Sequence, residues 1–269
     1  MDKYIIIISI ILILLIIFLI YKNKKFLNEH FQIPDNNIYT SIDNLNDLMT
    51  YVINLKKDVE RKEIIIKQLE NNNLNYEITE AVNGSELDLE KLKKENMIKI
   101  TEGELKKGQY GCYLSHINIW KKFLETDKKY CLVLEDDALL CDNFNKKINH
   151  MIWELNNLDL NISKNNVDMI YLIPETSCIP FFGKEPCNKF AEHPNIKNIS
   201  KPVHLGYGMY GYIITRKGAE NLLKLAIPMT LPIDVLTHHL NYTNTLNIVK
   251  TVNPYVIHDG KYSNTENIK

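Results

Sequence analysis

The sequence predicts an α/β fold, in which a single domain forms around a mostly parallel central sheet and follows an N-terminal transmembrane helix. Short apolar runs alternate with amphipathic helical segments over residues 50–269, a pattern typical of α/β domains. Residues 4–21 are almost entirely apolar, and residues 26–49 are polar, rich in asparagine and without a sustained hydrophobic period. We therefore expect a membrane anchor at 1–25, a polar stem at 26–49 and one folded domain at 50–269.

The apolar segment near the N-terminus has the properties of an uncleaved anchor. From Ile5 to Ile20 only Ser9 is polar, and a helix of this length reaches roughly 24–27 Å, enough to cross a bilayer when its flanking residues snorkel. A cleaved signal peptide would have a shorter apolar stretch followed by small residues, whereas three lysines follow here within 22–25. These lysines favour a cytoplasmic domain, but N-glycosylation sequons point the other way, so the side of the membrane stays open.

Composition and charge exclude several classes of protein. The 32 basic and 33 acidic residues leave a net charge of −1, so the basic excess of a nucleic-acid-binding domain is missing and we expect no nucleic acid partner. Five cysteines are an odd number, and none forms a CxxC pair or a Cys/His zinc spacing. A disulfide scaffold and a zinc module are therefore not predicted.

Hydrophobic spacing predicts the order of strands and helices in the domain. Strands are expected where apolar residues run together before a turn, and helices where apolar residues recur every three or four positions. The second predicted strand stops at the turn pair Asn83-Gly84. In chain order the predicted elements are strand 51–55, helix 59–69, strand 76–82, helix 111–124, strand 130–134, helix 144–155, strand 169–173, strand 211–215 and helix 218–225.

Three consecutive carboxylates, Glu135, Asp136 and Asp137, directly follow the predicted strand 130–134. In α/β sheets, ligands bind beyond the carboxyl ends of strands. A divalent cation such as Mg²⁺ or Mn²⁺, which takes oxygen ligands, would relieve the repulsion between adjacent carboxylates. Because residues two apart on a strand share a face, we expect Glu135 and Asp137 to point together and Asp136 to turn aside. A solvated acidic turn is the alternative.

A second segment, residues 108–116, lies at the entrance of the predicted helix 111–124. Its glycines at 108 and 111 allow close backbone approach, and free N–H groups at a helix start can bind a phosphate. Ser115 and His116 then lie in the first turns of the helix. A structural histidine is the alternative for His116.

Two later residues complete the candidate set. Asp234 follows Pro232-Ile233 and is placed either to cap a helix or to act as an acid in its first turn. His258 stands near the C-terminus, where the tail could fold over a metal site. An ordinary surface histidine is the alternative there.

Six segments, in this order along the chain, resemble glycosyltransferase family 25, which includes lipooligosaccharide and collagen galactosyltransferases. Each alone is weak, but six in sequence are specific, and the resemblance as a whole covers about Tyr51 to Ser263. The segments are 52–57 with Asp58 and Arg61, 81–84, 108–116 with Trp120, 132–138, 211–219 and 232–234.

The resemblance implies a GT-A-like fold, a divalent metal, usually Mn²⁺, and a nucleotide-sugar donor, most often UDP-galactose or UDP-glucose. It also implies inversion at the anomeric carbon of the sugar. Asp137 and Glu135 would hold the metal against the donor diphosphate, and His258 is a further candidate ligand. Asp234 is the candidate base that deprotonates the acceptor hydroxyl.

The same resemblance places the remaining residues around the donor. Asp136 would lie near the ribose, Asn54 and Arg61 beside the nucleotide pocket, and Ser115 and His116 along the border of the donor site.

Three positions depart from the family pattern. Gln109 stands where the family usually has Glu, and Asn83 where it usually has Asp. Leu236 occupies the position at which collagen-type members carry a second acid, which makes a collagen acceptor less expected.

The predicted function is that of a membrane-anchored, metal-dependent, inverting glycosyltransferase. It would move a hexose, galactose or glucose, from a UDP-sugar to a hydroxyl acceptor on a glycan, glycolipid or protein. The alternative is a catalytically inactive family-25-like binding or scaffold protein tethered to a membrane. A metal-dependent phosphohydrolase would need further Asp/His ligand pairs, which the sequence does not clearly supply.

Overall fold

A computed structural model describes residues 44–99, 105–157, 167–173, 191–192, 199–201 and 208–259. The chain divides into two compact units, Met1–Ile42 and Asp43–Lys269. The predicted span at 4–21 lies outside the described residues, and no helix among the described residues has the length and apolar character needed to cross a membrane. Residues 44–49, which the sequence assigned to the stem, form the 3₁₀ helix η1 (Asn44–Asp47) and the start of the first strand.

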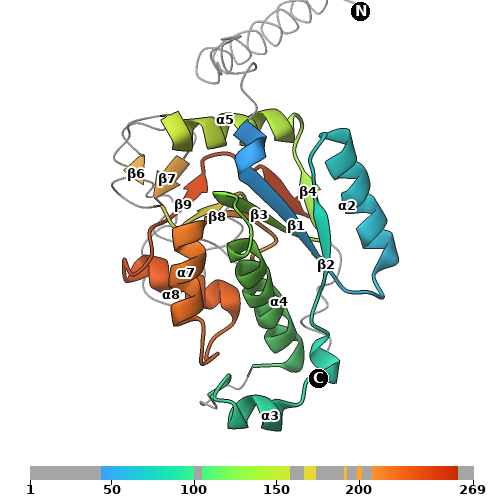
Figure 1. The fold of residues 1–269 in the computed structure, drawn as a ribbon, viewed down its shortest axis with the longest axis vertical. Helices are drawn as coiled ribbons and strands as arrows, with labels where there is room; N and C mark the ends of the chain where they lie inside the picture. Colours follow the sequence, from blue (N-terminus) through green and yellow to red (C-terminus); the bar gives the residue numbers. More distant parts are fainter. Residues whose placement is uncertain are drawn as a thin grey trace, which may run out of the picture. The chain divides into compact units, whose positions relative to one another are not determined.

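An eight-stranded sheet forms the centre of the second unit (Figure 1). Six of its strands run in the same direction, while β8 and β7 run opposite. The prediction of an α/β fold with a mostly parallel central sheet is therefore confirmed. In spatial order the strands are β2 (Glu77–Glu80), β1 (Leu48–Asn54), β3 (Tyr130–Glu135), β8 (Gly211–Thr215), β5 (Met169–Tyr171), β9 (Ile248–Thr251), β7 (Ile199–Lys201) and β6 (Ala191–Glu192).

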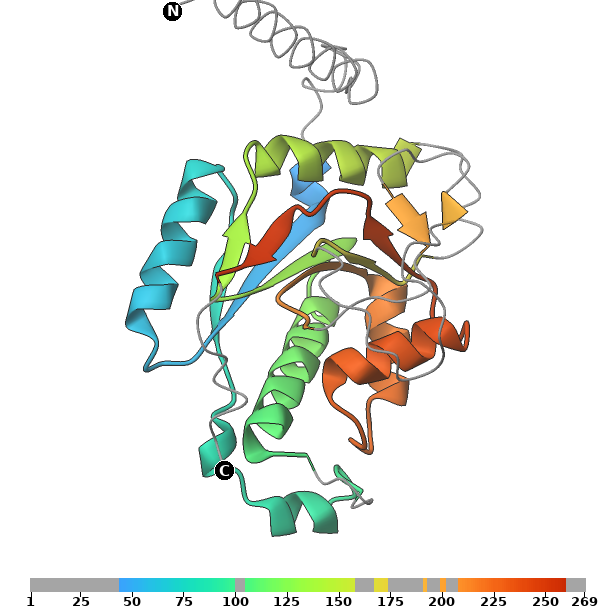
Figure 2. The same ribbon diagram turned by 180° about the vertical axis from the view of Figure 1, so that it is seen from behind.

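Helices cover both faces of this sheet. On one side lie α4 (Lys107–Leu124), α7 (Arg216–Leu225) and α8 (Ile233–Tyr242), and on the other lies α5 (Phe144–Asn157), as Figures 1 and 2 show. Helix α2 (Val59–Asn71) lies at the edge of the sheet, beside β4. Because both faces are covered, β3 is buried along almost its whole length, which explains its continuous apolar run.

Several short elements have no counterpart in the sequence prediction. They include β4 (Ala138–Leu140), which pairs antiparallel with β10 (Val256–His258) in a second sheet. A strand of three residues is too short to show a hydrophobic period. The other unpredicted elements are η2 (Gly84–Glu86), α3 (Leu89–Lys94), β6, β7 and β9.

The start of α4 contacts the segment that follows β2 through backbone atoms. A Cβ atom at Gly84 would lie 2.2 Å from the carbonyl oxygen of Lys107, and one at Gly111 would lie 2.6 Å from that of Val82. The Ser115 hydroxyl accepts a hydrogen bond from the Val82 N–H and donates one to the Gly111 carbonyl, both at 2.8 Å. Glycine is therefore required at both positions, and the contact joins the end of β2 to the first turns of α4.

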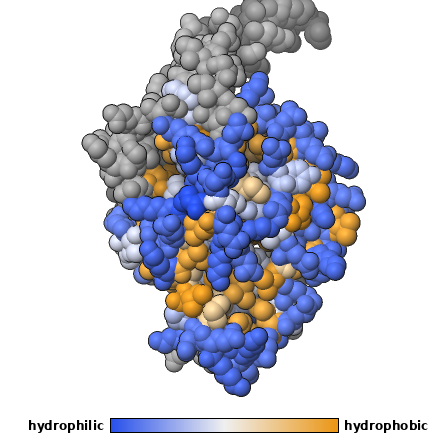
Figure 3. Space-filling view, in the orientation of Figure 1, coloured by the Kyte–Doolittle hydropathy of each residue, from blue (hydrophilic) through white to orange (hydrophobic). Residues whose placement is uncertain are grey.

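The surface of the domain is mostly hydrophilic on the face that Figure 3 shows. Hydrophilic side chains cover most of the face drawn in Figure 3, with apolar side chains exposed in smaller areas between them. This mixture is ordinary for a globular protein.

Candidate active site

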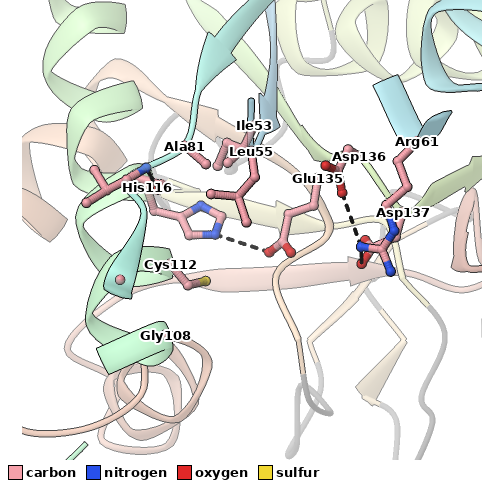
Figure 4. A pocket seen from close by; sticks show the side chains of 13 residues that line it. Ile53, Leu55, Arg61, Ala81, Gly108, Cys112, His116, Glu135, Asp136 and Asp137 are labelled. Carbon is pink, nitrogen blue, oxygen red and sulfur yellow. Dashed lines mark hydrogen bonds and ion pairs between the residues drawn. The ribbon is translucent and has the colours of Figure 1, made fainter. Parts of the chain in front are cut away.

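A pocket of about 570 Å³, open to solvent, lies at the carboxyl ends of β1 and β3 and against the N-terminal half of α4 (Figure 4). Its position agrees with the rule that α/β sheets bind ligands beyond the carboxyl ends of their strands. The lining residues are Ile53, Leu55, Arg61, Ala81, Val82, Gly84, Gly108, Cys112, Ser115, His116, Glu135, Asp136 and Asp137.

One wall of the pocket is a cluster of charged side chains around Asp136 and Asp137. The Asn54 amide donates to Asp136 at 2.7 Å and to the Asp58 carbonyl at 3.1 Å. The Arg61 guanidinium donates to Asp136 at 3.4 Å and to Asp137 at 3.2 Å. Both aspartates are buried, so these donors partly offset the cost of removing their charges from water.

Asp137 carries the largest electrostatic strain in this cluster. Burial, together with the charges of Glu135 and Asp136, raises the pKa of Asp137 to about 8, although Arg61 opposes the shift. Its Oδ1 atom is buried and has no hydrogen-bond partner among the described residues. An unpaired buried carboxylate oxygen is costly, and a bound cation is one partner that would relieve this cost.

His258 approaches the same carboxylate from the small second sheet. Pairing of β10 with β4 sets His258 opposite Ala138, and the His258 Nε2 atom lies 3.3 Å from Asp137 Oδ2. The Asp259 N–H donates to the Asp137 carbonyl at 3.0 Å. The predicted proximity of the C-terminal His258 to the acidic triplet is therefore observed.

The three carboxylates do not alternate as expected. Asp136 and Asp137 both reach Arg61, whereas Glu135 points toward His116 on the other wall of the pocket (Figure 4). The expectation that Glu135 and Asp137 point together was wrong because β3 ends at Glu135 and the next two residues form a turn. The two-residue alternation of a strand does not continue through that turn.

The opposite wall of the pocket comes from α4. His116 is fully buried and lies 3.3 Å from Glu135, measured from Nε2 to Oε1. Cys112 lies one turn earlier, and burial together with the charge of Glu135 raises the pKa of its thiol well above the ordinary value. The thiol is therefore protonated at neutral pH and is not an activated nucleophile.

Asp234 lies outside this pocket lining, in the first turn of α8. Its carboxylate accepts hydrogen bonds from the backbone N–H groups of Gly208, at 3.0 Å, and Val235, at 2.9 Å. The first of these bonds ties the chain before β8 to α8. Asp234 thus acts as an early helical acid in the described structure, and its role as a base stays a prediction.

One residue behind the pocket wall has no role predicted from the sequence. Tyr212 on β8 is fully buried, and its hydroxyl lies 2.9 Å both from His116 Nδ1 and from Trp120 Nε1. The only sequence signal is its place inside the family-like segment 211–219. An apolar strand gives no indication of which tyrosine hydroxyl will meet a histidine.

The side chains beside Asp137 are of the types that bind divalent metal ions. Two aspartates supply the oxygen atoms that Mg²⁺ and Mn²⁺ prefer, and His258 adds a nitrogen. The unpaired Asp137 Oδ1 is the observation that distinguishes this cluster from an ordinary salt bridge. Among the described residues, Cys112, His116 and Glu135 are the group of such side chains whose ligand atoms all lie within 4.8 Å of one another.

Comparison with known proteins identifies the family. The model of "Glycosyltransferase family 25 (LPS biosynthesis protein)" matches residues 48–237. This chain therefore belongs to glycosyltransferase family 25, as the order of its motifs predicted.

Curated relatives come from animals and bacteria. Procollagen galactosyltransferase 2 of Homo sapiens is 27% identical over 180 residues, which cover 64% of this chain and 27% of the human protein. Procollagen galactosyltransferase 1-B of Xenopus laevis is 30% identical over 194 residues, covering 68% of this chain and 29% of that protein. The match therefore spans less than a third of either procollagen galactosyltransferase.

A bacterial relative matches over most of its length. Lipooligosaccharide biosynthesis protein lic2B of Haemophilus influenzae is 26% identical over 205 residues, covering 74% of this chain and 73% of that protein. Among solved structures, a glycosyltransferase involved in glycosylation of the major capsid of PBCV-1 aligns with a TM-score of 0.42 and 11% identity, covering 81% of this chain and 95% of that one.

Proposed function

We propose that the domain transfers a hexose, galactose or glucose, from a UDP-sugar to a hydroxyl group of a glycan, glycolipid or protein, with inversion at the anomeric carbon and with Mn²⁺ or Mg²⁺ bound. Membership of family 25 and the galactosyltransferase names of its relatives support this proposal. The observation that carries it is the buried, unpaired Oδ1 of Asp137 at the edge of a pocket at the end of β3.

The charged wall of the pocket would bind the diphosphate of the donor. A divalent cation held by Asp137, with Asp136 and His258 beside it, would neutralise the charge that develops on the departing diphosphate. Arg61 lines the same pocket, and its guanidinium can donate to phosphate oxygens. Asn54 holds the Asp136 carboxylate in place through a 2.7 Å hydrogen bond.

Transfer to an acceptor also needs a base for the attacking hydroxyl. We retain Asp234 in this role, because the first turn of α8 can present a carboxylate to an acceptor. Its two backbone hydrogen bonds would keep the carboxylate oriented while it takes up the proton.

A donor screen tests the proposed function. Purified protein would be incubated with UDP-, GDP- and CMP-sugars in the presence of Mn²⁺ or EDTA, and the released nucleotide detected by mass spectrometry. We expect UDP to be released in the samples that contain Mn²⁺ and not in those that contain EDTA. In the Asp137→Asn variant we expect the rate of UDP release to fall about 100-fold or more. Equal turnover in EDTA, or full activity of the variant, would contradict the metal site. Absence of turnover and of nucleotide-sugar binding would favour a catalytically inactive binding protein.

A further inference from the structure

A row of four polar side chains runs from the core to the pocket. Trp120 Nε1 lies 2.9 Å from the Tyr212 hydroxyl, this hydroxyl lies 2.9 Å from His116 Nδ1, and His116 Nε2 lies 3.3 Å from Glu135 Oε1. The first three side chains are fully buried, whereas Glu135 is 26% exposed and lines the pocket. The row therefore links the interior of the domain to a carboxylate that a ligand can reach.

The donors and acceptors available determine which group donates in each hydrogen bond of this row. The Trp120 N–H can only donate, so the Tyr212 oxygen accepts from it. Among the described residues, the only other polar atom that bonds to the Tyr212 hydroxyl is His116 Nδ1. Because a buried O–H group without an acceptor is costly, Tyr212 donates its proton to Nδ1.

The same count settles the tautomer of His116. With Nδ1 acting as an acceptor, the neutral imidazole carries its proton on Nε2. That proton points to Glu135 Oε1, so His116 donates to the carboxylate. The hydrogen bonds then run in one direction, from Trp120 through Tyr212 and His116 to Glu135.

This direction is incompatible with a metal ion bound between Cys112, His116 and Glu135, although their ligand atoms lie within 4.8 Å of one another. A metal on His116 Nε2 would move the ring proton to Nδ1, where it would face Tyr212. The Tyr212 O–H would then be buried without an acceptor. The group is therefore a hydrogen-bonding wall of the pocket.

We propose that Glu135, oriented by this row, accepts hydrogen bonds from hydroxyl groups of the donor sugar instead of binding the metal. The proposal rests on the proposed function and names the class of sugar: an uncharged hexose with free hydroxyl groups. Glu135 points away from the Asp136–Arg61–Asp137 cluster (Figure 4), and His116 occupies only one of its lone pairs. Its negative charge would repel the carboxylate of a uronic or sialic acid. Trp120, Tyr212 and His116 are positioning residues in this scheme.

Calorimetry measures the binding of UDP and of UDP-hexose, both with Mn²⁺, and distinguishes a Glu135 that binds the sugar from a Glu135 that binds the metal. In Glu135→Gln we expect the affinity for UDP-hexose to fall about 10-fold, because hydrogen bonds to a carboxylate are lost, and the affinity for UDP to stay within about twofold. The ratio of the affinity for UDP-hexose to the affinity for UDP-glucuronate should also be smaller in Glu135→Gln than in the wild type. If the variant bound UDP, UDP-hexose and Mn²⁺ all more weakly, by the same factor, Glu135 would be a metal ligand. A wild-type protein that binds neither nucleotide would instead overturn the proposed function.

Tyr212→Phe tests the row itself, with Tyr113→Phe as the matched control. Tyr113 lies on α4, is equally buried, and donates its hydroxyl to the Ala226 carbonyl at 2.8 Å, outside the row. In ¹⁵N spectra of histidine-labelled protein, assigned with a His116→Gln variant, we expect the Nε2–H tautomer in wild type and Tyr113→Phe, and a mixture of tautomers in Tyr212→Phe.

The KM for UDP-hexose should rise in Tyr212→Phe relative to Tyr113→Phe. An Nδ1–H tautomer in the wild type would overturn the proposal. A cobalt–thiolate charge-transfer band that disappears in Cys112→Ser would overturn it as well, because it would show a metal in the group.

Discussion

Two side chains that depart from the family pattern make capping contacts. Gln109 Oε1 accepts a hydrogen bond from the Lys106 N–H at 2.9 Å, at the start of α4. Asn83 Oδ1 accepts from the Ser85 N–H at 3.2 Å, at the start of η2. An amide oxygen accepts these bonds as a carboxylate would, so both substitutions preserve the local structure. Neither side chain lines the pocket.

The raised pKa of Asp137 predicts how stability depends on pH in the absence of metal. An unfolded aspartate ionises near pH 4, whereas folded Asp137 stays protonated up to about pH 8. The unfolded state therefore binds fewer protons between these values, and Asp137 lowers the stability of the fold increasingly as the pH rises through this window. Above about pH 8 the penalty is constant.

Replacement of Asp137 by Asn should remove this penalty. We expect the Tm of Asp137→Asn in EDTA to exceed that of the wild type at pH 8 by about 2 °C or more, and the difference to shrink toward pH 5. Thermal unfolding, monitored by circular dichroism, measures the Tm of both proteins at each pH. A variant that is less stable than the wild type at pH 8 would contradict the assignment of Asp137 as a strained carboxylate.

Asp234→Asn distinguishes a base from a residue that binds the donor. If Asp234 takes the proton from the acceptor, kcat should fall about 100-fold or more while the Kd for the UDP-sugar changes by no more than about twofold. Steady-state kinetics and calorimetry on the same preparations provide both numbers. Parallel losses in kcat and in affinity would indicate that Asp234 binds the donor.

At the scale of elements, the site depends on how closely α4 approaches the end of β2. The contact passes through Gly84 and Gly111, and the Ser115 hydroxyl accepts a hydrogen bond from the Val82 N–H and donates one to the Gly111 carbonyl. Arg216 performs a related task at the other end of α4, where it donates to the carbonyl groups of Leu124, Thr126 and Lys128. These residues place α4, and with it His116, against the sheet.

Gly84→Ala should disturb this packing. The added Cβ would meet the Lys107 carbonyl oxygen at 2.2 Å, a backbone atom that cannot move alone, so we expect a loss of about 1–3 kcal/mol in the free energy of unfolding. Ser85→Ala, at the exposed neighbour, is the control. Urea unfolding of the two variants measures the difference, and equal midpoints would show that the segment relaxes without cost.

At the scale of the whole molecule, the described residues all belong to the second unit, and the predicted anchor lies outside them. The second unit begins at Asp43, close to the end of the predicted stem at 49. We propose that residues 4–21 attach this unit to a membrane, because their apolar length suits a bilayer.

Removal of residues 1–43 tests this attachment. We expect the full chain to stay with the membrane pellet after carbonate extraction, and the shortened chain to appear in the supernatant with the same UDP-sugar turnover. A full chain released by carbonate would contradict a spanning anchor. A shortened chain without activity would show that the first unit contributes to the fold or to the site.

Much of the fold follows from local pattern. The hydrophobic pattern is a clear signal where an element is long and one or both of its faces are buried. It correctly predicted strands β1 and β3 and helices α2, α4 and α5. Short edge elements such as β4 and β10 have too few residues to show a period. They exist because they pair with each other.

The sequence alone determined the family, the α/β class and the position of three carboxylates at the end of a buried strand, since these depend on residue order and on periods that repeat within one element. Tertiary structure decided the direction in which each carboxylate points, because β3 stops at Glu135 and the turn after it has no regular alternation. It also brought His258 to Asp137 and Tyr212 to His116 from distant parts of the chain. Such contacts arise from packing between elements, which no local pattern encodes.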